Sequence, residues 1–93
     1  MEQHIDMICV CACDGSMTPL RFRLLGSDQL AQTAAVTQLV SCKPVQYIGI
    51  ECMEYLCLAK LGEQECPCVL RYDFRSHSWF LVEKPPVKRC YHF

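Results

Sequence analysis

Apolar side chains recur at every second position over much of this chain, which is the period of a β-strand and not of a helix. Residues 7–13 are apolar at both parities, and this predicts a strand enclosed on both faces. Residues 19–25, 51–61 and 68–74 alternate apolar with polar side chains, and residues 79–83 form a short last strand. Short strands at roughly even spacing predict an all-β fold, a small antiparallel barrel of about five to six strands.

Turn signals separate the predicted strands. Asp14-Gly15 predicts a tight turn, because glycine accepts a positive φ and aspartate tolerates one, so residues 7–13 and 19–25 should form a hairpin. Residues 62–65 and 75–78 predict two further turns. The alternation places Leu20, Phe22 and Leu24 on the inner face with Arg21 and Arg23 outside, and it places Tyr72 and Phe74 inside.

Residues 29–42 allow two interpretations. The alanines favour a short helix within residues 28–38, capped by Ser27 or Asp28. The β-branched residues of the same stretch favour a strand, which we expect over its second half.

Length and composition limit the organisation of the chain. Ninety-three residues support a single core, so we expect one barrel domain over residues 1–84 and an extended arm over residues 85–93, which begins at Pro85-Pro86. The net charge of −1 argues against a surface devoted to polyanions. The chain shows neither a secretory signal nor a membrane span, and we therefore expect it in the cytoplasm, where its nine cysteines stay reduced.

The cysteines raise the question of a metal site. Cys11 and Cys13 on one strand, and Cys66 and Cys68 near a turn, are the candidate ligands, with Cys9, His77 or His92 able to complete a zinc site. Residues two apart on a strand lie about 6.6 Å apart, whereas sulfurs on one tetrahedral zinc lie under about 4 Å apart. We therefore expect no cofactor and interpret the thiols as small core side chains, with a zinc or thiol-redox site as the alternative.

Catalytic patterns are missing from the sequence. It contains no nucleophile elbow, phosphate-binding glycine loop or paired carboxylates, and His77 stands in a tight turn. We therefore expect a protein that is not an enzyme.

Two surface features are candidates for binding. Arg21, Arg23, Arg71 and Arg75 would form a basic stripe for weak nucleic-acid binding if their strands were neighbours. Tyr91 and Phe93 end the arm, where they would cover a barrel edge or contact a partner.

The chain resembles a group of small uncharacterised bacterial β proteins, some of which are encoded beside translesion (Y-family) DNA polymerases. The resemblance rests on Asp14-Gly15, on residues 18–22, on the Tyr72-Asp73-Phe74 turn and on residues 79–82. It implies an SH3-like or related barrel of bacterial origin with an accessory role and no catalysis, and it carries over no functional residue.

The leading hypothesis is a non-enzymatic binding module that acts by contact with another protein or with a second copy of itself, without a membrane. The metal or thiol-redox domain and the weak nucleic-acid binder are the alternatives.

Overall fold

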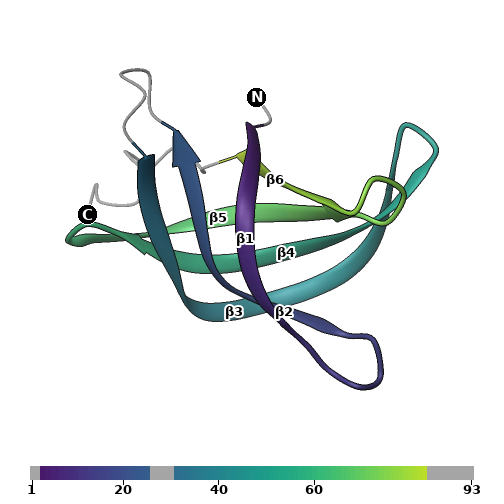
Figure 1. The fold of residues 1–93 in the computed structure, drawn as a ribbon, viewed down its shortest axis with the longest axis horizontal. Helices are drawn as coiled ribbons and strands as arrows, with labels where there is room; N and C mark the ends of the chain where they lie inside the picture. Colours follow the sequence, from purple (N-terminus) through teal and green to yellow (C-terminus); the bar gives the residue numbers. More distant parts are fainter. Residues whose placement is uncertain (1–2, 26–30, 84–93) are drawn as a thin grey trace.

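The fold is a closed antiparallel β-barrel (Figure 1). The computed structural model describes residues 3–25 and 31–83. Strand order around the barrel follows the chain, and the last strand pairs with the first, so the prediction of a small all-β barrel is confirmed. The strands are β1 (Gln3–Cys11), β2 (Met17–Leu25), β3 (Ala31–Tyr47), β4 (Ile50–Leu61), β5 (Gln64–Asp73) and β6 (Ser78–Glu83).

The stretch that allowed either a helix or a strand forms a strand from Ala31 onward. β3 is 17 residues long and pairs with β2 on one side and β4 on the other. Because these two neighbours satisfy its backbone and bury Ala34, pairing overrides the helix preference of the alanines. The helix interpretation is therefore wrong for residues 31–38, and residues 28–30 lie outside the described part.

The predicted hairpins form at the predicted turns. β1 pairs with β2 around a turn in which Gly15 has φ +92, and the Asp14 carboxylate accepts hydrogen bonds from the Ser16 N–H (2.9 Å) and hydroxyl (2.7 Å). These bonds lower the pKa of Asp14, the backbone N–H contributing most. β4 and β5 meet at Gly62, which has φ +67. The turn chemistry in the sequence was sufficient to place both hairpins.

The core fills the barrel with side chains from all six strands. Tyr55 and Trp79 pack with ring centroids 5.2 Å apart, and Leu70 is fully buried. The buried residues of the core are Ile5, Phe22, Ala34, Tyr55, Cys57, Ala59, Cys68, Leu70, Trp79 and Leu81.

Two predicted inner-face residues lie outside. The pairing of β1 with β2 shifts between Ile8 and Cys9, so Leu20 has no partner across the ladder. This bulge turns Leu20 outward, where it is 42% exposed, and gives its inner position to the buried Pro19. Phe74 follows the last residue of β5 and is 44% exposed, with its ring edge against Tyr72 at 5.4 Å.

The barrel is splayed at one end. β1 pairs with β6 only over residues 3–5, and β2 pairs with β3 only from Arg21 onward. Residues 8–20 therefore project beyond both neighbours as a two-stranded arm, called here the β1–β2 arm; Figure 1 shows it at the lower right. No helix among the described residues has the length and hydrophobicity to cross a bilayer. The C-terminal arm, with Tyr91 and Phe93, lies outside the described part.

Candidate protein-binding site

The structure does not gather the cysteines predicted as metal ligands. Cys11 and Cys13 are exposed at the end of the β1–β2 arm, whereas Cys68 is buried and Cys66 half-buried on β5, which is not a neighbour of β1. Over residues 3–25 and 31–83, no three His, Cys, Asp or Glu side chains are grouped as metal ligands. His77 lies in the β5–β6 turn with φ +57, and its Nδ1 is 2.9 Å from the Tyr72 hydroxyl. His92 is outside the described part.

A different pair of thiols meets across two strands. Cys57 on β4 lies directly opposite Cys68 on β5, with the two sulfurs 3.9 Å apart. This pair was not among the predicted ligands, which were chosen by their spacing along one strand. The turn at Gly62 could have predicted the pair. It places Leu61 opposite Gln64, and four residues further from the turn on each strand Cys57 lies opposite Cys68.

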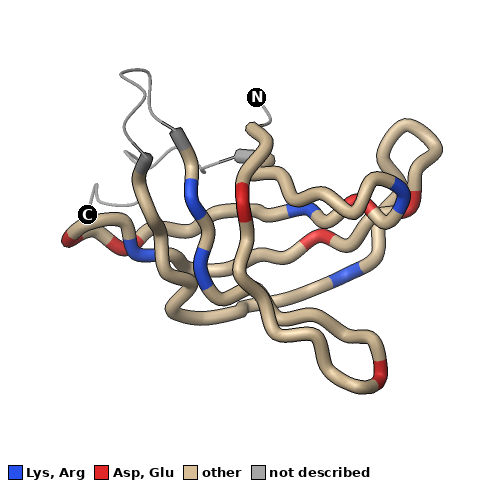
Figure 2. The backbone as a smooth tube through the Cα atoms, in the orientation of Figure 1, with Lys and Arg blue, Asp and Glu red and all other residues tan. Residues whose placement is uncertain are grey.

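The predicted basic stripe does not form, because β2 and β5 are not neighbours. Arg21 and Arg23 are exposed on β2, and Arg23 pairs with Asp6 at 2.8 Å. Arg75 lies beyond β5 in the turn. Figure 2 shows Lys and Arg spread over separate strands.

Arg71 is buried and is therefore not available on the surface as the predicted basic stripe would require. Its guanidinium carbon lies 4.0 Å from the ring centroid of Tyr47 and 5.1 Å from that of Phe80, which are cation–π distances. Phe80 also stacks on His4 at 4.9 Å. These residues belong to a row of cross-strand partners that runs over the outer side of five strands. In order around the barrel the row is His4, Phe80, Arg71, Glu54 and Lys43. The row ties β1 and β6 to β3, β4 and β5, so we interpret Arg71 as a structural residue.

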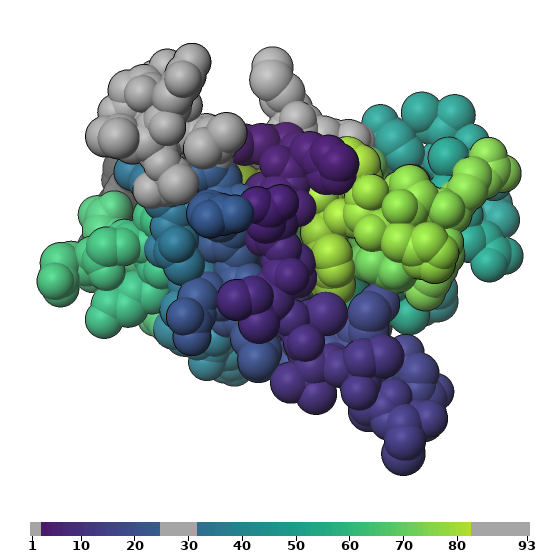
Figure 3. Space-filling view, viewed as in Figure 1, coloured from purple at the N-terminus to yellow at the C-terminus, as the bar shows by residue number. Residues whose placement is uncertain are grey.

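The outer face of the β1–β2 arm gathers exposed apolar side chains. Ile8 is 59% exposed, Val10 52% and Leu20 42%; we call these three the apolar patch. Ile8 and Val10 lie two apart on β1 and therefore share one face. Leu20 lies in the bulge of β2, next to Arg21, the partner of Ile8, and it is exposed on the same side. Figure 3 shows the arm standing out from the body of the molecule. A set of apolar side chains presented in this way is typical of an interaction surface.

Beside the patch, one edge of β1 has no strand neighbour. Over residues 6–11, β1 is paired with β2 alone among the described residues. This stretch carries one charge, Asp6 at its end, and has no proline. β3 also extends past its β2 neighbour, but two register shifts, Lys43 and Pro44 interrupt that edge. Bulges, lysine and proline are the devices that block edge pairing, and the β1 edge lacks lysine and proline.

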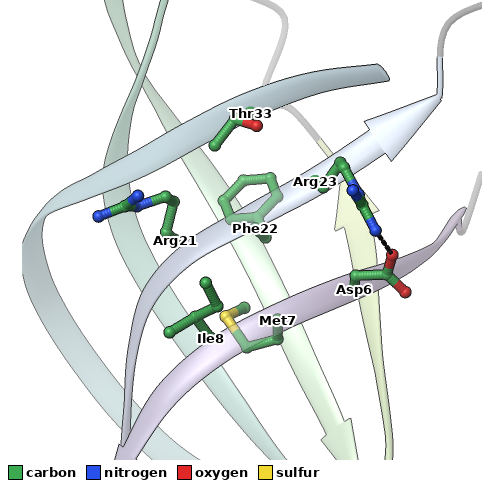
Figure 4. Close-up of a pocket in the computed structure, with 7 residues that line it drawn as sticks. All are labelled: Asp6, Met7, Ile8, Arg21, Phe22, Arg23 and Thr33. Atoms are coloured by element: carbon green, nitrogen blue, oxygen red, sulfur yellow. Dashed lines mark hydrogen bonds and ion pairs between the residues drawn. The ribbon is translucent and has the colours of Figure 1, made fainter. Parts of the chain in front are cut away.

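A hollow of about 280 Å³ adjoins the patch (Figure 4). Ile8 lies on one side, with Arg21 and the Arg23–Asp6 ion pair around it, and Arg21 points away from that pair. The lining residues are Asp6, Met7, Ile8, Arg21, Phe22, Arg23 and Thr33. The hollow therefore offers an apolar floor with a cation at its margin.

A second exposed apolar group lies at the β3–β4 turn. Ile48 is 81% exposed and has φ +52, a conformation that a β-branched residue rarely adopts. Gly49 follows with φ +78, so both turn residues are left-handed, as a two-residue hairpin of this type requires. The exposed Phe74 contributes its N–H to the Glu51 carbonyl nearby.

An uncovered backbone edge and an apolar patch thus lie together on β1 and β2, with the exposed Arg21 next to them, and such an edge can accept an added strand. No protein-family model, no curated protein and no solved structure matches the chain.

Proposed function

We propose that this protein is a non-enzymatic binding module, and that it acts by pairing the β1 edge of one copy with the β1 edge of a second. The observation that carries the proposal is the coincidence of the unpaired edge over residues 6–11 with the apolar patch on the same arm. An added strand would satisfy backbone groups along the edge, and its side chains would contact the patch from the side.

The charges of the edge are compatible with a second copy. In an antiparallel pair related by a two-fold axis, Asp6 at one end of the edge meets the opposite end of the partner strand, near Cys11. Like charges therefore do not oppose each other, and Asp6 is already compensated by Arg23 at 2.8 Å. With Cys9 on the axis, Ile8 of each copy lies opposite Val10 of the other, and the two patches meet in an isologous contact.

The alternatives have less structural support. Nucleic-acid binding by Arg21, Arg23, Arg71 and Arg75 would require them to share a surface. However, Arg21 and Arg23 lie on β2, Arg75 lies in the turn after β5, and Arg71 is buried on β5. A zinc site from Cys11, Cys13, Cys66 and Cys68 would require strands that are not neighbours to approach each other.

Sedimentation velocity over a range of protein concentrations tests the proposal with two matched variants. Val10→Lys places a charge in the patch, while Val40→Lys makes the same change on β3 at a residue of nearly equal exposure (52% and 51%). We expect concentration-dependent association of the wild-type chain and of Val40→Lys, and a monomer for Val10→Lys. Monomeric wild-type protein at all concentrations, or equal association of both variants, would refute the proposal.

A further inference from the structure

Two buried thiols are in register between β4 and β5. Cys57 is 0% exposed and Cys68 2%, and their sulfurs lie 3.9 Å apart. Both belong to the core. Tyr55 lies two residues from Cys57 on β4, Leu70 lies two residues from Cys68 on β5, and both are also buried in the core. This pair is independent of the β1–β2 arm and of the function proposed for it.

The backbone already has the geometry of a disulfide. Directly opposed residues of antiparallel strands have Cα atoms about 4.5–5.5 Å apart, and a disulfide spans about 4.4–6.8 Å. Because Cys57 and Cys68 are directly opposed, the bond needs side-chain rotation and little movement of the strands. Cys9 and Cys11 lack this geometry because they lie two apart on the same strand, and Cys13 lies in the turn beyond it.

The surroundings favour reaction at this pair. The hydrogen bond between the two thiols lowers the pKa of Cys57, although burial acts in the opposite direction. Cys68 also lines a small hollow of about 20 Å³, together with the half-buried Cys66 and the apolar side chains of Phe22 and Leu24. Space of about 10–15 Å³ is enough for one water molecule. The hollow therefore has room for a molecule of about that size beside Cys68, whose sulfur is 3.9 Å from that of Cys57.

We propose that Cys57 and Cys68 form a redox-modification site, at which a small hydroperoxide such as hydrogen peroxide joins β4 to β5 by a disulfide. The Cys57 thiolate attacks one peroxide oxygen, so that an S–O bond forms, the O–O bond breaks and hydroxide leaves. The Cys68 sulfur then attacks the sulfenic sulfur, an S–S bond forms, and the hydroxyl group leaves with the Cys68 proton as water. Two thiols are oxidised and one peroxide is reduced to two waters, counting the proton first lost from Cys57.

Mass spectrometry of the full-length native chain tests the proposal. The protein is freed of reductant, treated with hydrogen peroxide, quenched with catalase, unfolded in excess iodoacetamide and digested after Lys, Arg and Glu. We expect the peptide covering residues 55–60 to be linked to the peptide covering residues 66–71, with the loss of two hydrogen masses. The second peptide contains Cys66 as well as Cys68, so the experiment is repeated on Cys66→Ser, which should keep the link.

Matched variants separate the pair from the other thiols. Cys57→Ala and Cys68→Ala should abolish the link, and Cys42→Ala, which removes an exposed thiol, should leave it intact. The melting temperature of the oxidised wild type should rise, while that of Cys57→Ala should not. Alkylated Cys57 and Cys68 after oxidation, a link that is lost in Cys66→Ser, or a link that forms only in denaturant would overturn the proposal.

Discussion

The thiols of β1 differ in their contacts and in the direction of their pKa shifts from the pair formed by Cys57 of β4 and Cys68 of β5. On β1, burial raises the pKa of Cys9, and the charge of Cys11 adds to the effect. Between β4 and β5, a hydrogen bond from one thiol lowers the pKa of the other. Cysteines two apart on one strand do not contact each other, but cysteines eleven apart do, because the hairpin register brings them together.

The same contrast holds for the strands themselves. β4 and β5 are paired on both sides and supply three of the four largest fully buried side chains, Leu70, Cys52 and Cys57; the fourth is Pro19 of β2. The β1–β2 arm is paired only within itself and leaves large apolar side chains in water. A strand with neighbours on both sides stabilises the fold, whereas a strand with one neighbour has backbone groups available for a partner.

The largest effect is expected when a core side chain and a patch side chain are each shortened to alanine and the losses in the free energy of unfolding are compared. Leu70→Ala removes a fully buried side chain from β5 and should lower the free energy of unfolding by about 2–5 kcal/mol. Val10→Ala on the arm should change it by less than about 0.5 kcal/mol, as expected for a surface position. Urea titration followed by tryptophan fluorescence measures both, using Trp79. Equal losses would show that the arm is part of the folded core.

The second test uses alkaline pH. Burial is the largest contribution that raises the pKa of Tyr55 to about 12 from its ordinary value of 10.0, and nearby Cys42 adds to it. Because the folded pKa is the higher, the neutral phenol favours folding below pH 10, and this contribution is lost as the pH rises to 12. We expect the urea midpoint to fall between pH 10 and 12, and to fall less steeply in Tyr55→Phe. Parallel pH profiles for the two proteins would contradict the assignment.

A third, smaller effect concerns the two classes of arginine. Arg71→Lys keeps the charge but removes the planar group that contacts the rings of Tyr47 and Phe80, and it should lower the free energy of unfolding by about 1 kcal/mol. Arg21→Lys, at an exposed position, should have no measurable effect on the melting temperature. If the two substitutions shifted the melting temperature equally, the stack would not be contributing.

The smallest effect is expected at the exposed ion pair of the barrel surface. Asp6→Asn removes the partner of Arg23 but should reduce stability by less than about 1 kcal/mol, because both side chains are mostly in water. High salt should remove the difference between the two proteins in thermal unfolding. A difference that persists in high salt would indicate a role beyond charge pairing.

Ile48 shows where local sequence rules mislead. A two-residue turn with two left-handed residues is ordinarily formed by Asn-Gly or Gly-Gly, and only Gly49 provides such a signal here. No prediction was made for residues 45–50, because Tyr47 and Ile48 carry no turn chemistry. Pairing of β3 with β4 along nearly their whole length imposes the turn on Ile48.

Residue alternation and turn chemistry in the sequence determined that the chain is all-β, where β1 pairs with β2, and how β4 meets β5. These features depend on side chains two to four positions apart, and a single strand or turn already expresses them. The tertiary structure alone decided that β6 closes on β1, that a bulge turns Leu20 outward, and that Arg71 is buried against two aromatic rings. Those outcomes depend on which distant strands become neighbours, and neighbours are selected by the packing of the whole barrel, which no local pattern specifies.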